Sequence, residues 1–180
     1  GDLIEEILPR IPPERAEDVI LFDPADLERP MGLNIMEADT EDQKHFMVSS
    51  IIGLFYKLYD PHQQGIVGPR LEHSIRNAML TVMSEPGSTF IEVQRALTDS
   101  SFVQEILPKV TDPIVRRFWT DQMAQTSEFH KSETLDYIVS KFSRFTTNKL
   151  MRNIIGQSKS SFNFRQVMDE KKIFLANLSK

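Results

Sequence analysis

Two short apolar runs, one near each end of the chain, constrain its fold more than any other feature. Val19-Ile20-Leu21-Phe22 stands between acidic residues, and Ile173-Phe174-Leu175-Ala176 follows two lysines. Apolar runs without polar alternation are typical of strands buried on both faces, as in parallel sheets. The sequence therefore predicts two strands, near residues 18–22 and 172–178, which we expect to be adjacent and parallel.

Between these runs the hydrophobic pattern is helical. From about residue 39 to 155, apolar residues recur at intervals of three and four, which is typical of helices with one buried face. Thr89 and Glu92 have the spacing of a capping box. Ser132 predicts the start of a long helix, and Gly156 predicts a C-terminal cap in the left-handed conformation.

We therefore expect a mainly α fold with a minor parallel β component, in three segments. Residues 1–38 and 156–180 would belong to an α/β sheet whose other strands lie outside the chain. Residues 39–155 would form an all-α domain inserted between them. The helical segment could fold alone. The flanking segments could not, because an isolated pair of strands is only marginally stable in water.

The sequence excludes several kinds of chemistry. It contains no cysteine, which removes disulfides, thiol nucleophiles and cysteine-ligated zinc. It contains no phosphate-binding loop of the Walker type, and its four histidines lack the spacing of metal ligands. No apolar run approaches the roughly 18 residues that cross a bilayer, so we expect no membrane contact from this segment. We predict no catalytic residue, no cofactor-binding residue and no metal ligand.

Two carboxylates follow the first apolar run. Asp23 and Asp26 stand at the end of a predicted strand, where α/β folds often bind ligands. An aspartate before a proline is also a common way to open a turn, and we favour that interpretation.

Charge is distributed unevenly along the chain. Residues 1–48 hold thirteen acidic and four basic side chains, whereas residues 141–180 hold nine basic and two acidic ones. Such a split indicates either that one end faces a polyanion or an acidic partner, or that the two ends of one fold attract each other.

The basic C-terminal part also contains phenylalanines, because Phe142, Phe145, Phe162 and Phe164 alternate with its cations. Phosphates need cations and exposed bases stack on rings, so this composition suits single-stranded nucleic acid. It equally suits a helix whose rings point inward while its cations are solvated. For the wider aromatic stripe we favour a place in the core; its members are Phe118, Trp119, Phe129, Phe142 and Phe145. The candidate nucleic-acid contacts, taken from a set that also includes Lys141, are Arg144, Lys149, Arg152, Lys159 and Arg165.

Three stretches resemble a known family. The first runs from Gly1-Asp2-Leu3 through Asp18–Pro24 to Gly32-Leu33-Asn34-Ile35, and the second combines Gly68-Pro69-Arg70 with Arg76–Leu80. The third, Asn163–Lys180, is the most distinctive. Together they cover nearly the whole chain and resemble the TraD/TraG-type conjugative coupling proteins of type IV secretion, within the HerA/FtsK-like motor ATPases.

This resemblance implies a fragment of a RecA-like P-loop ATPase whose nucleotide-binding domain is interrupted by an all-α insertion. The intact protein would bind ATP and Mg²⁺, assemble as a homo-hexamer and move single-stranded DNA. A secretion channel or DNA-processing complex would be a further partner. It would be cytoplasmic, and any association with the inner membrane would lie in other segments. Against the family pattern, the chain begins after the phosphate loop and stops before the acidic metal-positioning strand, so we expect it to be inactive alone.

Two points remain open in the sequence. The motif Gly68-Pro69-Arg70 matches the family without a physical role beyond shaping a turn. The alternative interpretation of the whole chain is a stand-alone helical protein-interaction module with no enzymatic role, which predicts an exposed apolar patch on residues 39–155.

Overall fold

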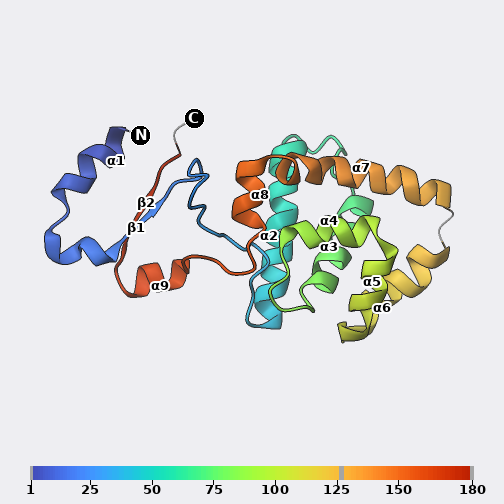
Figure 1. Cartoon of the computed structure of the whole chain (residues 1–180). Helices are drawn as coiled ribbons and strands as arrows, with labels where there is room; N and C mark the ends of the chain where they lie inside the picture. Colours follow the sequence, from blue (N-terminus) through green and yellow to red (C-terminus); the bar gives the residue numbers. More distant parts are fainter. Residues whose placement is uncertain (1, 126–127, 179–180) are drawn as a thin grey trace.

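The chain forms a mainly helical structure with a small parallel sheet at one end. A computed structural model describes residues 2–125 and 128–178 (Figure 1). Both ends of the chain contribute to the sheet end of the molecule. Its elements are α1 (Asp2–Ile7), η1 (Leu8–Arg10), η2 (Pro13–Asp18), β1 (Val19–Phe22), α9 (Phe164–Asp169) and β2 (Ile173–Ala176).

The rest of the chain is a helical body. It begins at a helix capped by the Thr40 side chain, which accepts a hydrogen bond from Gln43 N. The elements of the body are α2 (Glu41–Tyr59), α3 (Pro69–Val82), α4 (Phe90–Thr98), α5 (Ser100–Ile106), η3 (Leu107–Lys109), α6 (Pro113–Arg117), the π-helical turn η4 (Phe118–Met123), α7 (Glu128–Thr146) and α8 (Lys149–Ile155).

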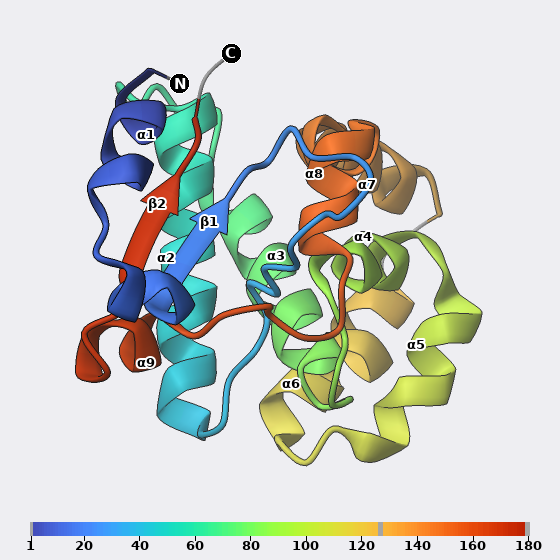
Figure 2. The ribbon, with the colours of Figure 1, turned by 60° about the vertical axis from the view of Figure 1, so that its left-hand side comes forward.

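The two predicted strands are confirmed, and they are adjacent and parallel (Figure 2). Val19 lies opposite Ile173 and Phe22 lies opposite Ala176. The pairing continues past the strand, because Asn177 N donates to Phe22 O at 2.8 Å. The expected burial on both faces is not met: none of the eight strand residues is buried within the part of the chain that the structure describes.

The core of the helical body is built around three phenylalanine rings. Phe142 is fully buried, and its ring centroid lies 4.8 Å from that of Phe90 and 5.2 Å from that of Phe55. Burial of these rings stabilises the helical body, because each removes a large apolar area from water. The apolar stripe of α3, predicted from its spacing, is buried throughout: Leu71, Ile75, Ala78, Met79 and Val82.

The predicted aromatic stripe mostly belongs to the same core. Phe118 is buried, and the half-buried Trp119 donates from Nε1 to Thr81 Oγ1 at 2.7 Å, which satisfies its polar atom. The side chain of Phe129 lies outside the described part of the chain.

Two segments, residues 30–37 and 154–161, connect the sheet end to the helical body and are called the neck (Figure 1). They are hydrogen-bonded to each other along their length. Ser161 N donates to Gly32 O at 2.8 Å, and Asn34 N donates to Ser160 Oγ at 3.0 Å. The Asn34 side chain also donates to the Ser158 and Ser88 carbonyls. Serine and asparagine are needed here because two loops without regular structure must satisfy each other's backbone groups.

Two local predictions are wrong. Gly156 ends α8 with φ −93°, so it does not adopt the left-handed conformation. Its small size is used for packing, because an added Cβ would lie 2.6 Å from Ile91 Cδ1. Ser132 lies inside α7 and does not start it, since Glu128 and Lys131 are good helix formers and carry the helix further toward its N-terminus.

The close contact at Gly32 predicts a stability effect. An added Cβ there would lie 2.7 Å from Lys159 O, a backbone atom of the opposite neck segment. We expect Gly32→Ala to lower the free energy of unfolding by about 1–3 kcal/mol, the usual cost of overpacking. Urea unfolding followed by far-ultraviolet circular dichroism measures it.

Gly53→Ala is the matched control. Gly53 is exposed in the middle of α2, and an added Cβ would meet no described atom within 4 Å. We expect this change to raise the unfolding free energy by about 0.5–1 kcal/mol, because alanine favours the helix and restricts the unfolded chain. Equal effects of the two substitutions would contradict the close-packed neck.

Candidate nucleic-acid interface

Three of the five predicted cations lie at one corner of the helical body. Arg144 is in the last turn of α7, and Lys149 and Arg152 are on α8, which packs against α7. Arg152 of α8 also links the two helices, because its Nη1 donates to Thr146 O at the end of α7 at 3.1 Å. We call Arg144, Lys149 and Arg152 the basic corner.

The other two cations lie elsewhere. Lys159 is in the neck, and Arg165 is in the first turn of α9 at the sheet end, apart from α8 in both ribbon views (Figure 2). All five side chains belong to exposed residues. Within the residues that the structure describes, none of the five forms an ion pair.

The phenylalanines between these cations do not form a stacking platform. Phe142 is fully buried, and Phe145 packs against Phe90 with ring centroids 5.7 Å apart. Phe162 is buried, and the exposed Phe164 packs its ring against it at 5.1 Å. On α7 the rings therefore point inward while Arg144 is exposed, which removes these rings from base stacking and leaves the cation accessible.

Some of the opposite charges at the two ends of the chain pair with each other. Lys172 Nζ lies 3.0 Å from Asp18 Oδ1, and Arg15 Nε lies 2.9 Å from Asp18 Oδ2. The hydrogen bonds from Lys172 and then Arg15 hold the pKa of Asp18 below its usual value of 3.8. The hydrogen bond to Asp18 in turn raises the pKa of Lys172 above 10.5. Lys172 thus forms an ion pair beside the two strands, whereas the side chains of the basic corner are exposed to solvent.

The carboxylates after β1 shape a turn. Asp23 Oδ1 accepts a hydrogen bond from Ala25 N at 2.9 Å, and Asp23 Oδ2 accepts one from Asn177 Nδ2 at 2.9 Å. These bonds, the first from Ala25, lower the pKa of Asp23. Asp26 Oδ1 accepts from Glu28 N and Arg29 N. The favoured interpretation of this pair as turn-forming residues agrees with these contacts.

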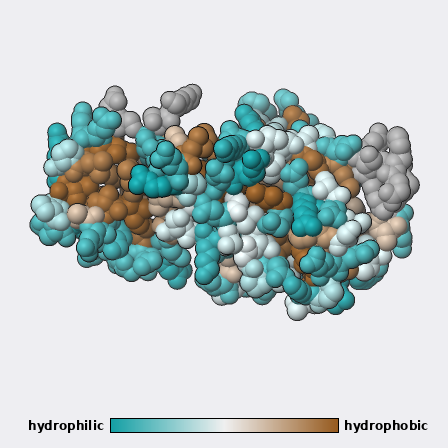
Figure 3. All heavy atoms as spheres, viewed as in Figure 1, coloured by the Kyte–Doolittle hydropathy of each residue, from teal (hydrophilic) through white to brown (hydrophobic). Residues whose placement is uncertain are grey.

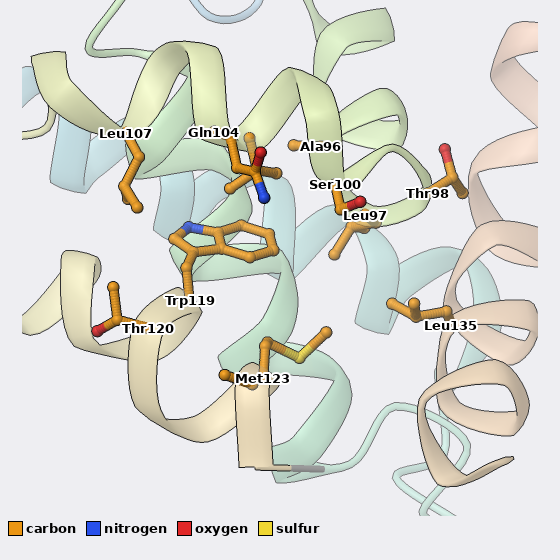
Figure 4. A pocket seen from close by; sticks show the side chains of 12 residues that line it. Ala96, Leu97, Thr98, Ser100, Gln104, Leu107, Trp119, Thr120, Met123 and Leu135 are labelled. Atoms are coloured by element: carbon orange, nitrogen blue, oxygen red, sulfur yellow. The ribbon is translucent and has the colours of Figure 1, made fainter. Parts of the chain in front are cut away.

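An apolar cavity of about 590 Å³ lies between α4, α5 and η4 (Figure 4). The indole ring of Trp119 forms one wall, and Leu107 and Met123 lie beside it. The size is within the range of ligand pockets. The described lining residues include no charged side chain, so this cavity offers no electrostatic contact to a nucleic acid.

Other functional classes find little support. Among residues 2–125 and 128–178, no three histidine, aspartate or glutamate side chains are grouped to hold a metal ion. No helix in the described parts has both the length and the apolar character needed to span a membrane. Comparison with protein-family models, curated proteins and solved structures finds no match to this chain.

The Asp18–Lys172 pair predicts a pH dependence. Because the folded pKa of Asp18 is lowered, its stabilising contribution is present above pH 3.8 and is lost as the pH falls through the lowered pKa. We expect a carboxyl NMR titration to place the Asp18 pKa below 3.8, and Lys172→Met to return it toward 3.8. Lys171→Met is the control, because this neighbouring lysine is exposed; an equal shift in both variants would contradict the assignment.

Proposed function

We propose that this chain is an internal part of a DNA-translocating P-loop ATPase of the TraD/TraG coupling-protein type. In this proposal, β1 and β2 belong to its RecA-like nucleotide-binding core, and residues 39–155 are an all-α insertion that contacts DNA. The parallel pairing of the two ends of the chain around a helical body carries the proposal, because it is the arrangement expected when helices are inserted into a parallel sheet.

The exposure of the sheet supports this view. Parallel sheets are normally covered on both faces, and a lone strand pair is marginal in water. Here Leu21 is 42% exposed, and the flanking Leu3 and Met168 are 68% and 72% exposed. Figure 3 shows this hydrophobic surface at the end of the molecule that holds α1 and the strands. Further strands and helices of a larger α/β domain would cover it.

The proposal assigns nucleotide binding and DNA contact to different parts of the protein. ATP and Mg²⁺ would bind to the phosphate loop and acidic strand of the intact protein, outside this chain. The intact cytoplasmic protein would assemble as a homo-hexamer and bind any secretion-channel partner. The basic corner would contact DNA, because Arg144, Lys149 and Arg152 are exposed at one site and have no acidic partner among the described residues.

The gene that encodes this chain provides the first test. We expect a phosphate loop encoded upstream of residue 1, and downstream of residue 180 a hydrophobic strand ending in acidic residues. We also expect the full-length protein to hydrolyse ATP in a DNA-stimulated manner and the 180-residue chain to be inactive. A complete reading frame without these two motifs would refute the proposal.

DNA binding provides the second test. We expect the chain to bind single-stranded DNA with an affinity that falls as salt rises. Replacing Arg144, Lys149 and Arg152 with glutamine should reduce the slope of log affinity against log salt by about 2, because each phosphate contact on a single strand contributes about 0.7.

The control for this test removes the same charge elsewhere. Arg10, Arg29 and Arg116 are exposed and lie on η1, on the loop after β1 and on α6. Their replacement by glutamine should leave the slope nearly unchanged. Equal loss in both triple variants would mean that net charge, and not the basic corner, governs binding.

The alternative, a helical protein-interaction module, is favoured by the apolar cavity beside Trp119. Trp119 is the only tryptophan of the chain, so its fluorescence reports on that cavity. A protein partner that changes this fluorescence, together with absence of DNA affinity, would favour the alternative.

A further inference from the structure

Gly68 and Arg70 of the Gly68-Pro69-Arg70 motif line a cavity that is separate from the basic corner and from the sheet. The cavity has a volume of about 350 Å³. It lies between the loop that joins α2 to α3, the first turn of α3 and the middle of α7. Its lining residues are Gly65, Ile66, Gly68, Arg70, Leu71, Tyr137 and Ile138.

The loop side of this cavity is fixed by a buried carboxylate. Asp60 accepts hydrogen bonds from Gln64 N at 2.6 Å, Gly65 N at 3.0 Å and Val67 N at 3.1 Å. Burial alone would raise the pKa of Asp60, and these N–H groups outweigh it and lower the pKa. The loop is therefore held in one shape although residues 61–66 are all exposed.

Two tyrosines tie α7 to this loop and to the end of α2. Tyr137 Oη donates to Ile66 O, and Tyr59 Oη donates to Lys141 O at 2.6 Å. Lys141 Nζ lies 4.6 Å from the centre of the Tyr137 ring and 5.3 Å from that of Tyr59. The ammonium group is thus held beside the cavity by two aromatic rings.

Arg70 is the charged side chain among the described residues that line the cavity. Arg70 is exposed and, within the described chain, has no ion-pair partner. The nearby acids are already engaged: Glu72 pairs with Arg76 at 2.9 Å, Asp60 is bound by the loop N–H groups, and Asp136 has an interaction of its own. An anion entering the cavity would meet Arg70 in its lining and Lys141 beside the Tyr137 ring, and the three acids named here, among the described side chains, already have partners.

The backbone at Gly68 has open space beside it, so a ligand in the cavity could approach it closely. Gly68 has φ −99° and ψ 174°, an extended conformation that any residue adopts. Among the described atoms, an added Cβ at Gly68 would meet only Gly65 O, at 3.9 Å. Gly68 is the N-cap of α3, where glycine is common, and the space beside it leaves the backbone within reach of a ligand.

We propose that Gly68, Arg70, Tyr137 and Lys141 form a phosphodiester-binding site for single-stranded nucleic acid. This inference rests on the proposed function and extends its interface beyond the basic corner. Tyr137, Lys141 and Arg144 are spaced by four and three residues on α7, so they share one face of that helix. A strand bound in the cavity continues along this face to the basic corner.

The test compares variants of the chain in binding to oligo(dT) across a range of salt concentrations. Replacing Arg70 and Lys141 with glutamine should reduce the log–log salt slope by about 1.4, two contacts of about 0.7 each. Arg116→Gln with Arg29→Gln removes the same charge from other exposed positions and should not change the slope.

Gly68→Ala tests close approach without changing charge. We expect a several-fold weaker affinity at an unchanged salt slope, with a slightly lower unfolding midpoint because alanine is a poorer N-cap than glycine. Gly53→Ala, at an exposed glycine with open space around it, is the matched control and should bind like the parent chain.

The outcomes separate the two proposals. If oligo(dT) binding depends on the basic corner but is unaffected by the Arg70, Lys141 and Gly68 substitutions, this site is wrong and the proposed DNA contact stands. If the parent chain binds no oligo(dT) at low salt, both are wrong.

Discussion

The parallel pairing of β1 with β2 is the constraint on which the rest of the structure depends. It places Val19 opposite Ile173 and Phe22 opposite Ala176, so the chain leaves the sheet after Phe22 at one end of the strand pair and returns at Ile173 at the other end. The helical body is therefore part of a long crossover connection between two parallel strands. The segments that lead from the sheet into the body and back again form the neck, where hydrogen bonds between them satisfy backbone groups that no regular structure pairs.

The position of the cations depends in turn on the phenylalanine core. Phe142 is fully buried against Phe55 and Phe90, which fixes the rotation of α7 about its axis. Once that face points inward, Tyr137, Lys141 and Arg144 must lie on another face. The same side chains that stabilise the fold thus determine which residues are exposed for the proposed nucleic-acid contact, and they remove Phe142 and Phe145 from any stacking role.

Much of this fold could be predicted from local patterns. The strands, the buried stripe of α3 and the capping box at Thr89 each depend on residues within a few positions of one another. The neck could not be predicted, because the bond between Asn34 N and Ser160 Oγ joins residues 126 positions apart. Gly156 shows a related limit: its sequence context suits a left-handed cap, and only the proximity of Ile91 from α4 reveals that small size is what matters.

The candidate interface was predictable to the same degree. Exposure of Arg144, Lys149 and Arg152 follows from helical periodicity, but the separation of Arg165 does not, because α9 comes after the neck and has already returned to the sheet end. Arg70 lies far from the basic tail in sequence and carries no signal of charge clustering. It lines one cavity with Tyr137 of α7, beside the loop that Asp60 holds and to which Tyr137 donates at Ile66. A charge pattern along the chain could not have suggested Arg70 for the proposed surface, because its proximity to α7 depends on the packing of α3 and on a loop fixed by a buried acid.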